Sequence, residues 1–234
     1  MIDDYVPLPK CVEFHNSHAP IRLVRSGNRA GSSFACAAEV ALAATKIQLD
    51  WYTGTYPSDP RIAVVGRDWM HTIRLMGRIL LDMLGMRHVI AVHWEDQSEE
   101  WPKRIKTPRA KIEFLHDSSE LSTLGGQFDL IWLDQDVPLV ESWLNYAKAD
   151  MQRRWKQTPV IWSYSLCPSK RNPFGACKEF VALSEKADGV NVFETVLSTF
   201  DNPHLNAGDV ALFAAAVGED RQAQITGEAC VAVQ

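Results

Sequence analysis

The sequence predicts an α/β domain with a doubly wound, mostly parallel sheet whose last strand runs antiparallel to its neighbours. Two observations predict this class. Short apolar runs typical of buried parallel strands alternate along the chain with segments whose apolar residues have helical spacing. The connection between the last two apolar runs, residues 199–209, is too short for a crossover helix, so those two strands are expected to pair antiparallel.

The length and composition predict one globular domain. The chain has 234 residues, of which 46% are hydrophobic and 23% charged, the balance of an ordinary folded protein. We expect residues 1–30 to form an irregular arm, residues 31–220 the α/β domain, and residues 221–234 a tail. No apolar run approaches the roughly 18 residues that span a bilayer, and the acidic N-terminus lacks a signal-peptide layout. A cytoplasmic location without membrane contact is therefore expected.

Charge and cysteine content exclude two further classes. The formal net charge of −5 argues against a protein that coats nucleic acid electrostatically, although it allows a local basic groove. The five cysteines are scattered, and none has a cysteine or histidine partner at zinc-finger spacing. Reduced thiols and no metal site are expected.

Each expected element follows from its residue pattern. Ser32 and Ser33 are placed to cap a helix whose alanine density favours helical structure. Residues 68–84 have apolar residues at helical spacing and are followed by Gly85, a typical C-cap residue. The polar stretch 95–110 indicates a loop. The expected strands are 61–66, 88–93, 111–116, 128–134, 159–166, 190–198 and 210–217, and the expected helices are 32–49, 68–84, 139–155 and 177–187.

Acidic residues follow two of the expected strands at their carboxyl ends. Asp117 comes directly after the third strand, and Asp134 closes the fourth. Open α/β sheets bind ligands at this edge, and a carboxylate after a strongly apolar strand needs a partner or a function. For each aspartate, the alternative is a helix N-cap or a solvated loop residue. The first strand ends at Gly66, and the second is followed by His93 and Glu95, of which Glu95 lies in a charged loop.

This order of strands and helices resembles the class I S-adenosylmethionine-dependent methyltransferases, a Rossmann-like fold whose last strand is antiparallel. The resemblance covers roughly residues 32–218 and implies S-adenosylmethionine as the cofactor. It also implies that Asp117 holds the adenine amino group and that Asp134 lies beside the cofactor. His93 and Glu95 take the place of the acid that binds the ribose hydroxyls.

The glycine-rich turn of that family is degenerate in this sequence. Gly66 is the single glycine after the first strand and is followed by arginine, aspartate and tryptophan. Glycines at this turn let the backbone approach the cofactor and let amide groups face it. Two interpretations stay open: the cofactor is bound in an altered way, or the fold has been kept for another purpose.

Within the family, the chain looks most like RNA ribose 2′-O-methyltransferases of the FtsJ and viral cap type, which carry a Lys-Asp-Lys-Glu tetrad. The resemblance implies Lys46, Asp134, Lys170 and Asp209 as the corresponding catalytic residues, with Glu194 as a rival for the last position. In such a tetrad a lysine with a lowered pKa takes the proton of the ribose hydroxyl. Lys46 has an alternative role, since it could extend from an amphipathic helix into solvent.

The sequence therefore supports two hypotheses about function. The first is a transferase that methylates RNA with S-adenosylmethionine, with the ribose 2′-O of a cap as the candidate acceptor. The alternative is a catalytically inactive methyltransferase-like domain that serves as a binding or assembly module. The terminal Gln234, after small apolar residues, resembles a cleavage product of viral 3C-like proteases and would fit a viral protein.

A basic patch offers a surface for an RNA partner. Lys103, Arg104, Lys106 and Arg109 lie close together in the sequence and adjoin Trp101. Such a combination suits phosphate contacts and base stacking, and a solvated loop is the alternative. Some of the eight tryptophans could lie on an oligomer interface.

A third hypothesis is an α/β enzyme that binds a nucleotide or NAD. Neither GxGxxG nor GxxxxGK[ST] occurs in the sequence, and both absences count against it.

Overall fold

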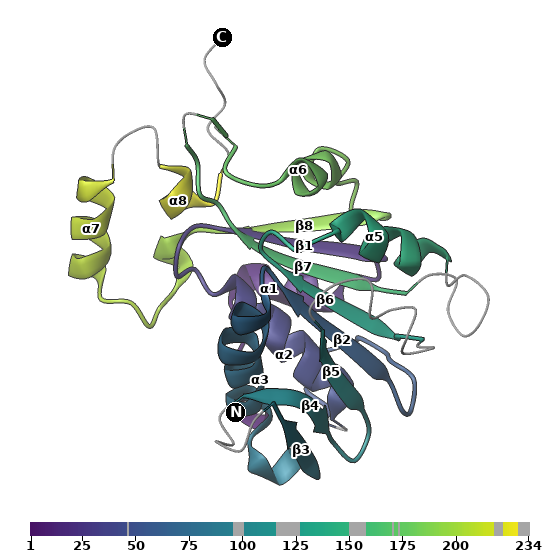
Figure 1. The fold of residues 1–234 in the computed structure, drawn as a ribbon. Coiled ribbons are helices and arrows are strands. Elements are labelled where there is room, and N and C mark those ends of the chain that lie inside the picture. The colour runs from purple at the N-terminus through teal and green to yellow at the C-terminus, as the bar shows by residue number, and fades with distance from the viewer. Residues whose placement is uncertain are drawn as a thin grey trace.

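The computed structural model describes residues 1–45, 47–95, 101–115, 127–149, 158–169, 171–172, 174–217 and 222–228. Within these residues the strands form one eight-stranded mixed sheet in the order β3-β4-β5-β2-β6-β7-β1-β8 (Figure 1). The strands are β1 (Ile21–Ser26), β2 (Arg61–Gly66), β3 (Ala91–Trp94), β4 (Pro102–Lys106), β5 (Lys111–Leu115), β6 (Leu130–Asp134), β7 (Val160–Ser165) and β8 (Val192–Leu197).

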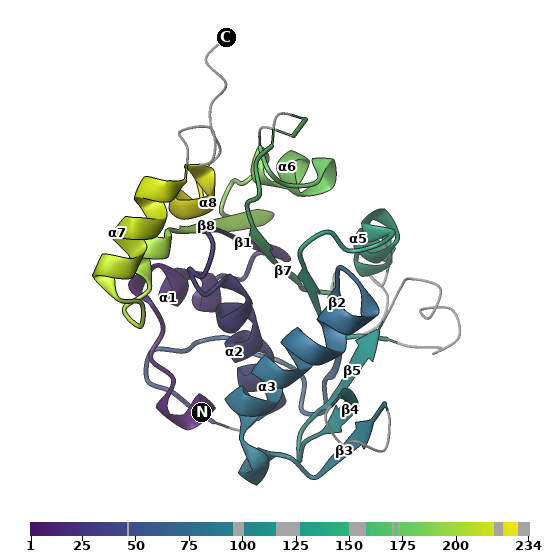
Figure 2. The ribbon, with the colours of Figure 1, turned by 60° about the vertical axis from the view of Figure 1, so that its left-hand side comes forward.

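Helices cover both faces of the sheet. On one face α1, α2 and α3 share a core with the strands, and on the other face α5 and α6 do so (Figures 1 and 2). Trp132 is buried in the first core, and Trp143 and Trp162 in the second. The described helices are α1 (Pro9–Asn16), α2 (Ser32–Ala44), α3 (Gly77–Leu84), α5 (Val140–Ala149), α6 (Lys178–Ser184), α7 (Ala207–Ala216) and α8 (Ala223–Thr226), with a π-helix at His71–Met76 and 3-10 turns at Ile2–Asp4, Met86–His88 and Thr199–Asp201.

The expected α/β fold with a mostly parallel sheet is confirmed. From β5 through β2, β6, β7 and β1 to β8, every neighbouring pair is parallel, so the carboxyl ends of these strands lie at one edge of the sheet. The expectation of an antiparallel last strand is wrong, because β8 runs parallel to β1. The antiparallel strand is β4, which pairs with β3 and β5 near the other edge.

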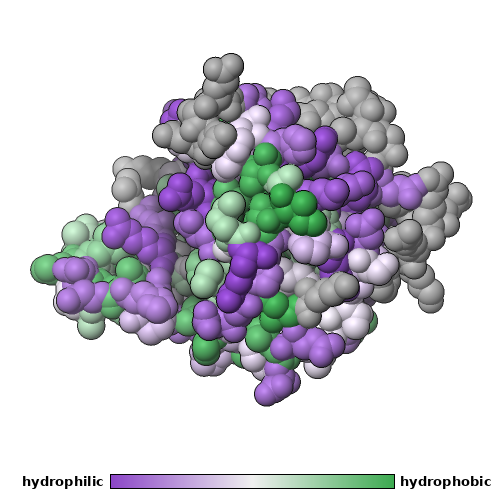
Figure 3. Space-filling model, turned by 90° about the horizontal axis from the view of Figure 1, so that it is seen from below, coloured by the Kyte–Doolittle hydropathy of each residue, from purple (hydrophilic) through white to green (hydrophobic). Residues whose placement is uncertain are grey.

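The segment expected as the last strand, residues 210–217, lies mostly in helix α7. The Asn206 side chain caps this helix by accepting hydrogen bonds from the Gly208 and Asp209 amides. Alanine dominates the segment and favours helix, whereas a short apolar run by itself does not distinguish strand from helix. The helix lies apart from the sheet at the left of Figure 1, and Leu212 on it is exposed. Figure 3 shows hydrophobic surface, coloured green, on the part of the molecule that protrudes at the left.

Charged residues hid two other strands from the sequence pattern. Residues 1–30, expected as an irregular arm, contain α1 and the inner strand β1, whose apolar run is interrupted by Arg22 and Arg25. The stretch 95–110, expected as a loop, contains β4, in which only Pro102 and Ile105 are buried and the three basic residues are exposed. Both strands depart from the continuous apolar run by which the other strands were recognised.

Among the described residues, none of the helices has the length and apolar character needed to cross a membrane.

A buried ion-pair network fastens α1 and α2 to β1. The Glu39 carboxylate of α2 has no exposed surface, and it accepts hydrogen bonds from Arg22 Nη1 at 2.9 Å and from His15 Nδ1 at 2.7 Å. The Tyr56 hydroxyl donates to the same carboxylate at 2.6 Å. Removing one partner of a buried pair leaves an uncompensated charge, which is more destabilising than the pair is stabilising.

We therefore predict that Glu39→Gln lowers the free energy of unfolding by about 3 kcal/mol, because the buried Arg22 guanidinium loses its counter-charge. Urea unfolding measures this value, and Glu13→Gln on the exposed side of α1 is the control that should leave it unchanged. Equal stabilities of the two variants would contradict the role assigned to the network.

The pH dependence of this effect has a defined direction. Burial raises the pKa of Glu39, but the charges of Arg22 and His15 and their hydrogen bonds outweigh it and lower the pKa to about 2. A lowered pKa in the folded state means that the stabilisation is complete above about pH 4.5 and disappears as the pH falls toward 2. The difference in unfolding free energy between wild type and Glu39→Gln should shrink over this interval.

Candidate functional site

The loop between β1 and α2 lies at the carboxyl edge of the sheet. It ends at Gly31, whose φ of +98° is left-handed and therefore favours glycine. No side chain of the described residues caps the N-terminus of α2, so the amide groups of its first turn remain available. Free amides at a helix N-terminus bind anions such as phosphate.

The spacing of residues in this loop matches a phosphate-binding loop with two substitutions. The pattern GxxxxGK[ST] aligns with residues 26–33 when Ser26 stands for the first glycine and Ser32 for the lysine. Gly31 and Ser33 then occupy the second glycine and the hydroxyl position. The Ser26 hydroxyl donates to Ser32 Oγ at 2.8 Å and lies 3.1 Å from Ser165 Oγ. Three serine hydroxyls are therefore clustered at the position where the motif has its lysine.

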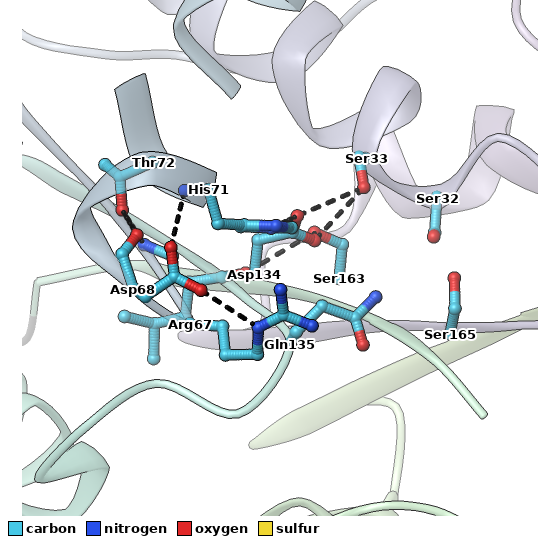
Figure 4. A network of polar contacts seen from close by, with 12 residues as sticks. Ser32, Ser33, Arg67, Asp68, His71, Thr72, Asp134, Gln135, Ser163 and Ser165 are labelled. Atoms are coloured by element: carbon cyan, nitrogen blue, oxygen red, sulfur yellow. Dashed lines mark hydrogen bonds and ion pairs between the residues drawn. The ribbon is translucent and has the colours of Figure 1, made fainter. Parts of the chain in front are cut away.

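The carboxylate of Asp134 is the centre of the site (Figure 4). It ends β6 and has no exposed surface. Ser33 Oγ of α2 donates to Oδ1 at 3.1 Å, and His71 Nε2 lies 2.8 Å from Oδ2. The Ser163 hydroxyl of β7 donates to Oδ1 as well. Three separate elements therefore converge on one buried carboxylate.

The backbone around His71 is fixed by its own hydrogen bonds. Asp68 Oδ1 accepts from the His71 amide at 2.8 Å, and this bond is the main reason why the pKa of Asp68 is lowered. Thr72 Oγ1 accepts from the Gly66 amide at 2.8 Å and donates to the Asp68 carbonyl. The π-helix His71–Met76 starts here, and such turns are frequent at functional sites.

The pair Ser33 and Asp134 fits a magnesium ion. P-loop nucleotide hydrolases hold Mg²⁺ with the hydroxyl that follows the loop and an aspartate at the end of a neighbouring strand. Two oxygens bound at right angles to Mg²⁺ at about 2.1 Å lie about 3.0 Å apart. The observed separation of Ser33 Oγ and Asp134 Oδ1 is 3.1 Å, close to the spacing of two ligands of one cation.

The arginines around this site differ in whether a carboxylate already engages them. Arg25 is engaged with Glu194 of β8 at 3.0 Å, and Arg67 lies 3.2 Å from Asp68. Arg29 lies within the loop, is exposed, and has a left-handed φ of 58°. Burial raises the pKa of the Cys36 thiol, one turn along α2 from Ser33, so this cysteine stays protonated.

Gln135 follows Asp134 in a strained conformation, with a φ of 62°. Its amide donates to the Ser163 carbonyl at 2.9 Å, and its carbonyl accepts from Trp162 Nε1 at 3.0 Å. Figure 4 shows its side chain on the side of Asp134 that faces Ser165. Backbone strain held in this way is found where a side chain must be placed for function.

The sequence-predicted residues are distributed over several places. Gly66 and Asp134 are register partners on the adjacent strands β2 and β6. His93 lies on β3 and Glu95 just after it, and β4, β5 and β2 separate them from β6. Asp209 lies in the first turn of α7 and is exposed. The remaining predicted residues, Lys46, Asp117 and Lys170, lie outside the described residues.

Two further features concern the predicted partners. Asp209 lines a cavity of about 680 Å³ together with Asn28 and Arg29, the exposed part of the β1–α2 loop. Three residues of the basic patch lie on β4, whereas the Arg109 guanidinium donates to the carbonyls of Thr45, Tyr56 and Pro57 and so supports a loop. RNA binding by Lys103, Arg104 and Lys106 stays a prediction.

Three residues of the site were missed by sequence reasoning: Ser33, His71 and Ser163. The signal that could have found Ser33 is the spacing of Gly31 within a strand–loop–helix unit. A search for the complete motif fails because serine stands at the lysine position. His71 and Ser163 belong to no such pattern.

Solved structures with this fold are phage large terminases. The chain matches the large terminase of a thermophilic bacteriophage in complex with ADP with a TM-score of 0.64 and 16% identity, covering 94% of this chain and 52% of that one. It matches the large terminase ATPase domain of Thermus phage P74-26 with a TM-score of 0.58 and 13% identity, covering 97% and 96%. The chain thus spans about half of the first of these two proteins. No protein-family model and no curated protein matches the sequence.

These matches correct the methyltransferase interpretation. The resemblance to class I methyltransferases is wrong, and so are the expectations of RNA methylation and of S-adenosylmethionine as cofactor, because the structural neighbours are terminase ATPase domains. The alternative of an inactive methyltransferase-like module is not supported either. The physical reason is the sheet: its last strand is parallel, and its loop of phosphate-binding spacing follows β1, a strand that the methyltransferase alignment did not include.

The hydrogen bonds of Asp134 predict a large effect on stability. Asp134→Ala should lower the free energy of unfolding by about 3 kcal/mol, because the buried hydroxyl of Ser163 and the half-buried hydroxyl of Ser33 lose their acceptor. Asp136→Ala, two residues away, removes an exposed carboxylate that accepts from Tyr164 and should change it by less than about 1 kcal/mol. Urea unfolding of both variants checks this, and similar losses would refute the central place of Asp134.

Proposed function

We propose that this chain is a nucleoside-triphosphate-binding domain of the large-terminase ATPase type, with its site at the carboxyl ends of β1 and β6. The observation that carries the proposal is the contact between Ser33 and Asp134 at 3.1 Å, across the β1–α2 loop. This is the pair with which P-loop enzymes hold the magnesium ion of a bound nucleotide.

The similar structures support a nucleotide as the ligand. The large terminase of the thermophilic bacteriophage was solved in complex with ADP and, in a further structure with a TM-score of 0.61 and 14% identity, in complex with ATP-gamma-S. The fold likeness covers 94% of this chain. ATP is accordingly the nucleotide that we propose.

Each part of the site has a role in binding. The first-turn amides of α2 and the loop before it face the phosphates. Ser33 and Asp134 hold the divalent cation, which when bound neutralises the charge between the β- and γ-phosphates. The exposed Arg29 lies in the same loop and adds positive charge to the phosphate side.

The serine at position 32 weakens phosphate binding in this proposal. A lysine there would place an ammonium group against the β- and γ-phosphates, whereas Ser32 offers a buried hydroxyl that accepts from Ser26. A neutral hydrogen bond is roughly half as strong as a charge-assisted one. The site is therefore expected to bind ATP more weakly than a complete P-loop does.

The glutamine after Asp134 makes slow hydrolysis the expectation. A carboxamide can orient an attacking water through its oxygen and its NH₂ group. It cannot take the proton of that water, which a carboxylate at the same position could do as a general base. We therefore propose that Gln135 orients the attacking water, and we expect ATP hydrolysis to be slow.

Titration with ATP-gamma-S in the presence of a divalent cation tests the proposal. Wild type should bind, and Ser33→Ala should weaken cation-dependent binding at least about tenfold, or about 1.4 kcal/mol. Ser142→Ala on the exposed face of α5 is the matched control and should bind like wild type. Absence of binding at millimolar nucleotide, or equal binding by both variants, would refute the proposal.

Two substitutions should increase function. Ser32→Lys restores the charge of the motif and should raise the affinity for ATP about tenfold, measured by calorimetry. Gln135→Glu supplies a general base and should raise the rate of phosphate release at least about tenfold without a matching change in affinity. If Ser32→Lys folds and leaves the affinity unchanged, the loop does not hold the phosphates.

A further inference from the structure

His71 brings a nitrogen atom to the cation position. Its Nε2 lies 2.8 Å from Asp134 Oδ2, and the side chain is only 11% exposed. The oxygen pair Ser33 and Asp134 already suits a cation, so the imidazole is a third group at the same place. Figure 4 shows the ring extending from its helical turn toward Asp134 and Ser33.

The surroundings hold the ring there. A Cβ added at Gly66 would lie 2.6 Å from His71 Cδ2, so the ring occupies space that only a glycine leaves open. The Asp68 carboxylate fixes the His71 amide at 2.8 Å. The imidazole of His71 is therefore positioned by Gly66, by Asp68 and by the π-helix.

The distances suit a shared cation. Asp134 Oδ2 lies 2.8 Å from His71 Nε2 and 3.3 Å from Ser33 Oγ. Ligands at right angles on a cation with bonds of about 2.1 Å lie about 3.0 Å apart. Each of these two separations is thus close to the distance between neighbouring ligands in an octahedral coordination shell.

We propose that His71 is a ligand of the divalent cation held by Ser33 and Asp134, and that the site therefore prefers Mn²⁺ to Mg²⁺. The inference rests on the cation position of the proposed function. Mg²⁺ favours oxygen ligands and gives up water reluctantly, whereas imidazole suits the divalent transition metals. A site with a nitrogen ligand therefore selects against Mg²⁺.

Coordination requires a change of the proton on the ring. In the neutral tautomer that carries its hydrogen on Nε2, the ring donates to Asp134 Oδ2. Binding a cation uses the lone pair of Nε2 in the neutral imidazole, so the single ring proton then resides on Nδ1. No oxidation or bond cleavage is involved.

Electron paramagnetic resonance of Mn²⁺ added to the full chain tests this inference. Wild type should bind Mn²⁺ at least about tenfold more tightly than Mg²⁺ in competition, and spin-echo spectra should contain the nitrogen coupling of a bound imidazole. His71→Ala should lose this coupling and at least about tenfold of the Mn²⁺ affinity, the order that loss of a group at a metal site costs. His93→Ala, an exposed histidine on β3, is the control and should behave like wild type.

The outcomes separate the two proposals. His71→Asn offers an oxygen in place of the nitrogen and should shift the preference toward Mg²⁺, with circular dichroism confirming that the variants fold. Bound Mn²⁺ without nitrogen coupling, or no Mn²⁺ binding at all, overturns the inference. If ATP-gamma-S binds and the coupling is absent, only this inference fails. If the coupling is present and no nucleotide binds, only the proposed function fails.

Discussion

A fully buried carboxylate at the end of a central strand sets the requirements that the rest of this site meets. Removing a carboxylate from water costs several kcal/mol unless hydrogen bonds or opposite charges replace the solvent. Asp134 meets this condition because β6 lies between β2 and β7, so that Ser163 donates from one side and His71 approaches from the other. Ser33 reaches it from α2. The parallel order of the strands is therefore what makes the buried charge tolerable.

Strands β2 and β6 could be predicted from the sequence because they are nearly continuous apolar runs. Strands β5 and β7 could be predicted as well, although Lys111 and Glu113 interrupt the first and serines the second. β1 could not, because Arg22 within it is buried only through its pairing with Glu39, and that partner lies 17 residues away. The apolar run 210–217 predicts a strand and is a helix, because a short apolar run alone does not distinguish the two. Its capping residue Asn206 is a helix signal that the strand assignment passed over.

Only those residues of the candidate site that belong to a local sequence pattern could be predicted. Asp134 and Gly66 end apolar strands, and that feature is visible in the sequence. Ser33 contributes through a loop whose motif lacks its lysine, so a motif search rejects it. His71 and Ser163 act through contacts across 63 and 29 residues of chain, which depend on strand order. The order of the strands depends on the packing of the whole sheet, so no short sequence segment predicts it.

Helix α2 links the stability of the fold to the geometry of the site. Eleven of its thirteen residues are buried, and most of these are alanines, whose small side chains let the helix lie close against the sheet. Its first turn places Ser33 at Asp134, and Glu39 in its middle pairs with Arg22 of β1. The ion pair therefore fixes the helix on the same strand from which the β1–α2 loop departs. Because the two contacts share one rigid helix, the buried pair defines the position from which Ser33 reaches Asp134.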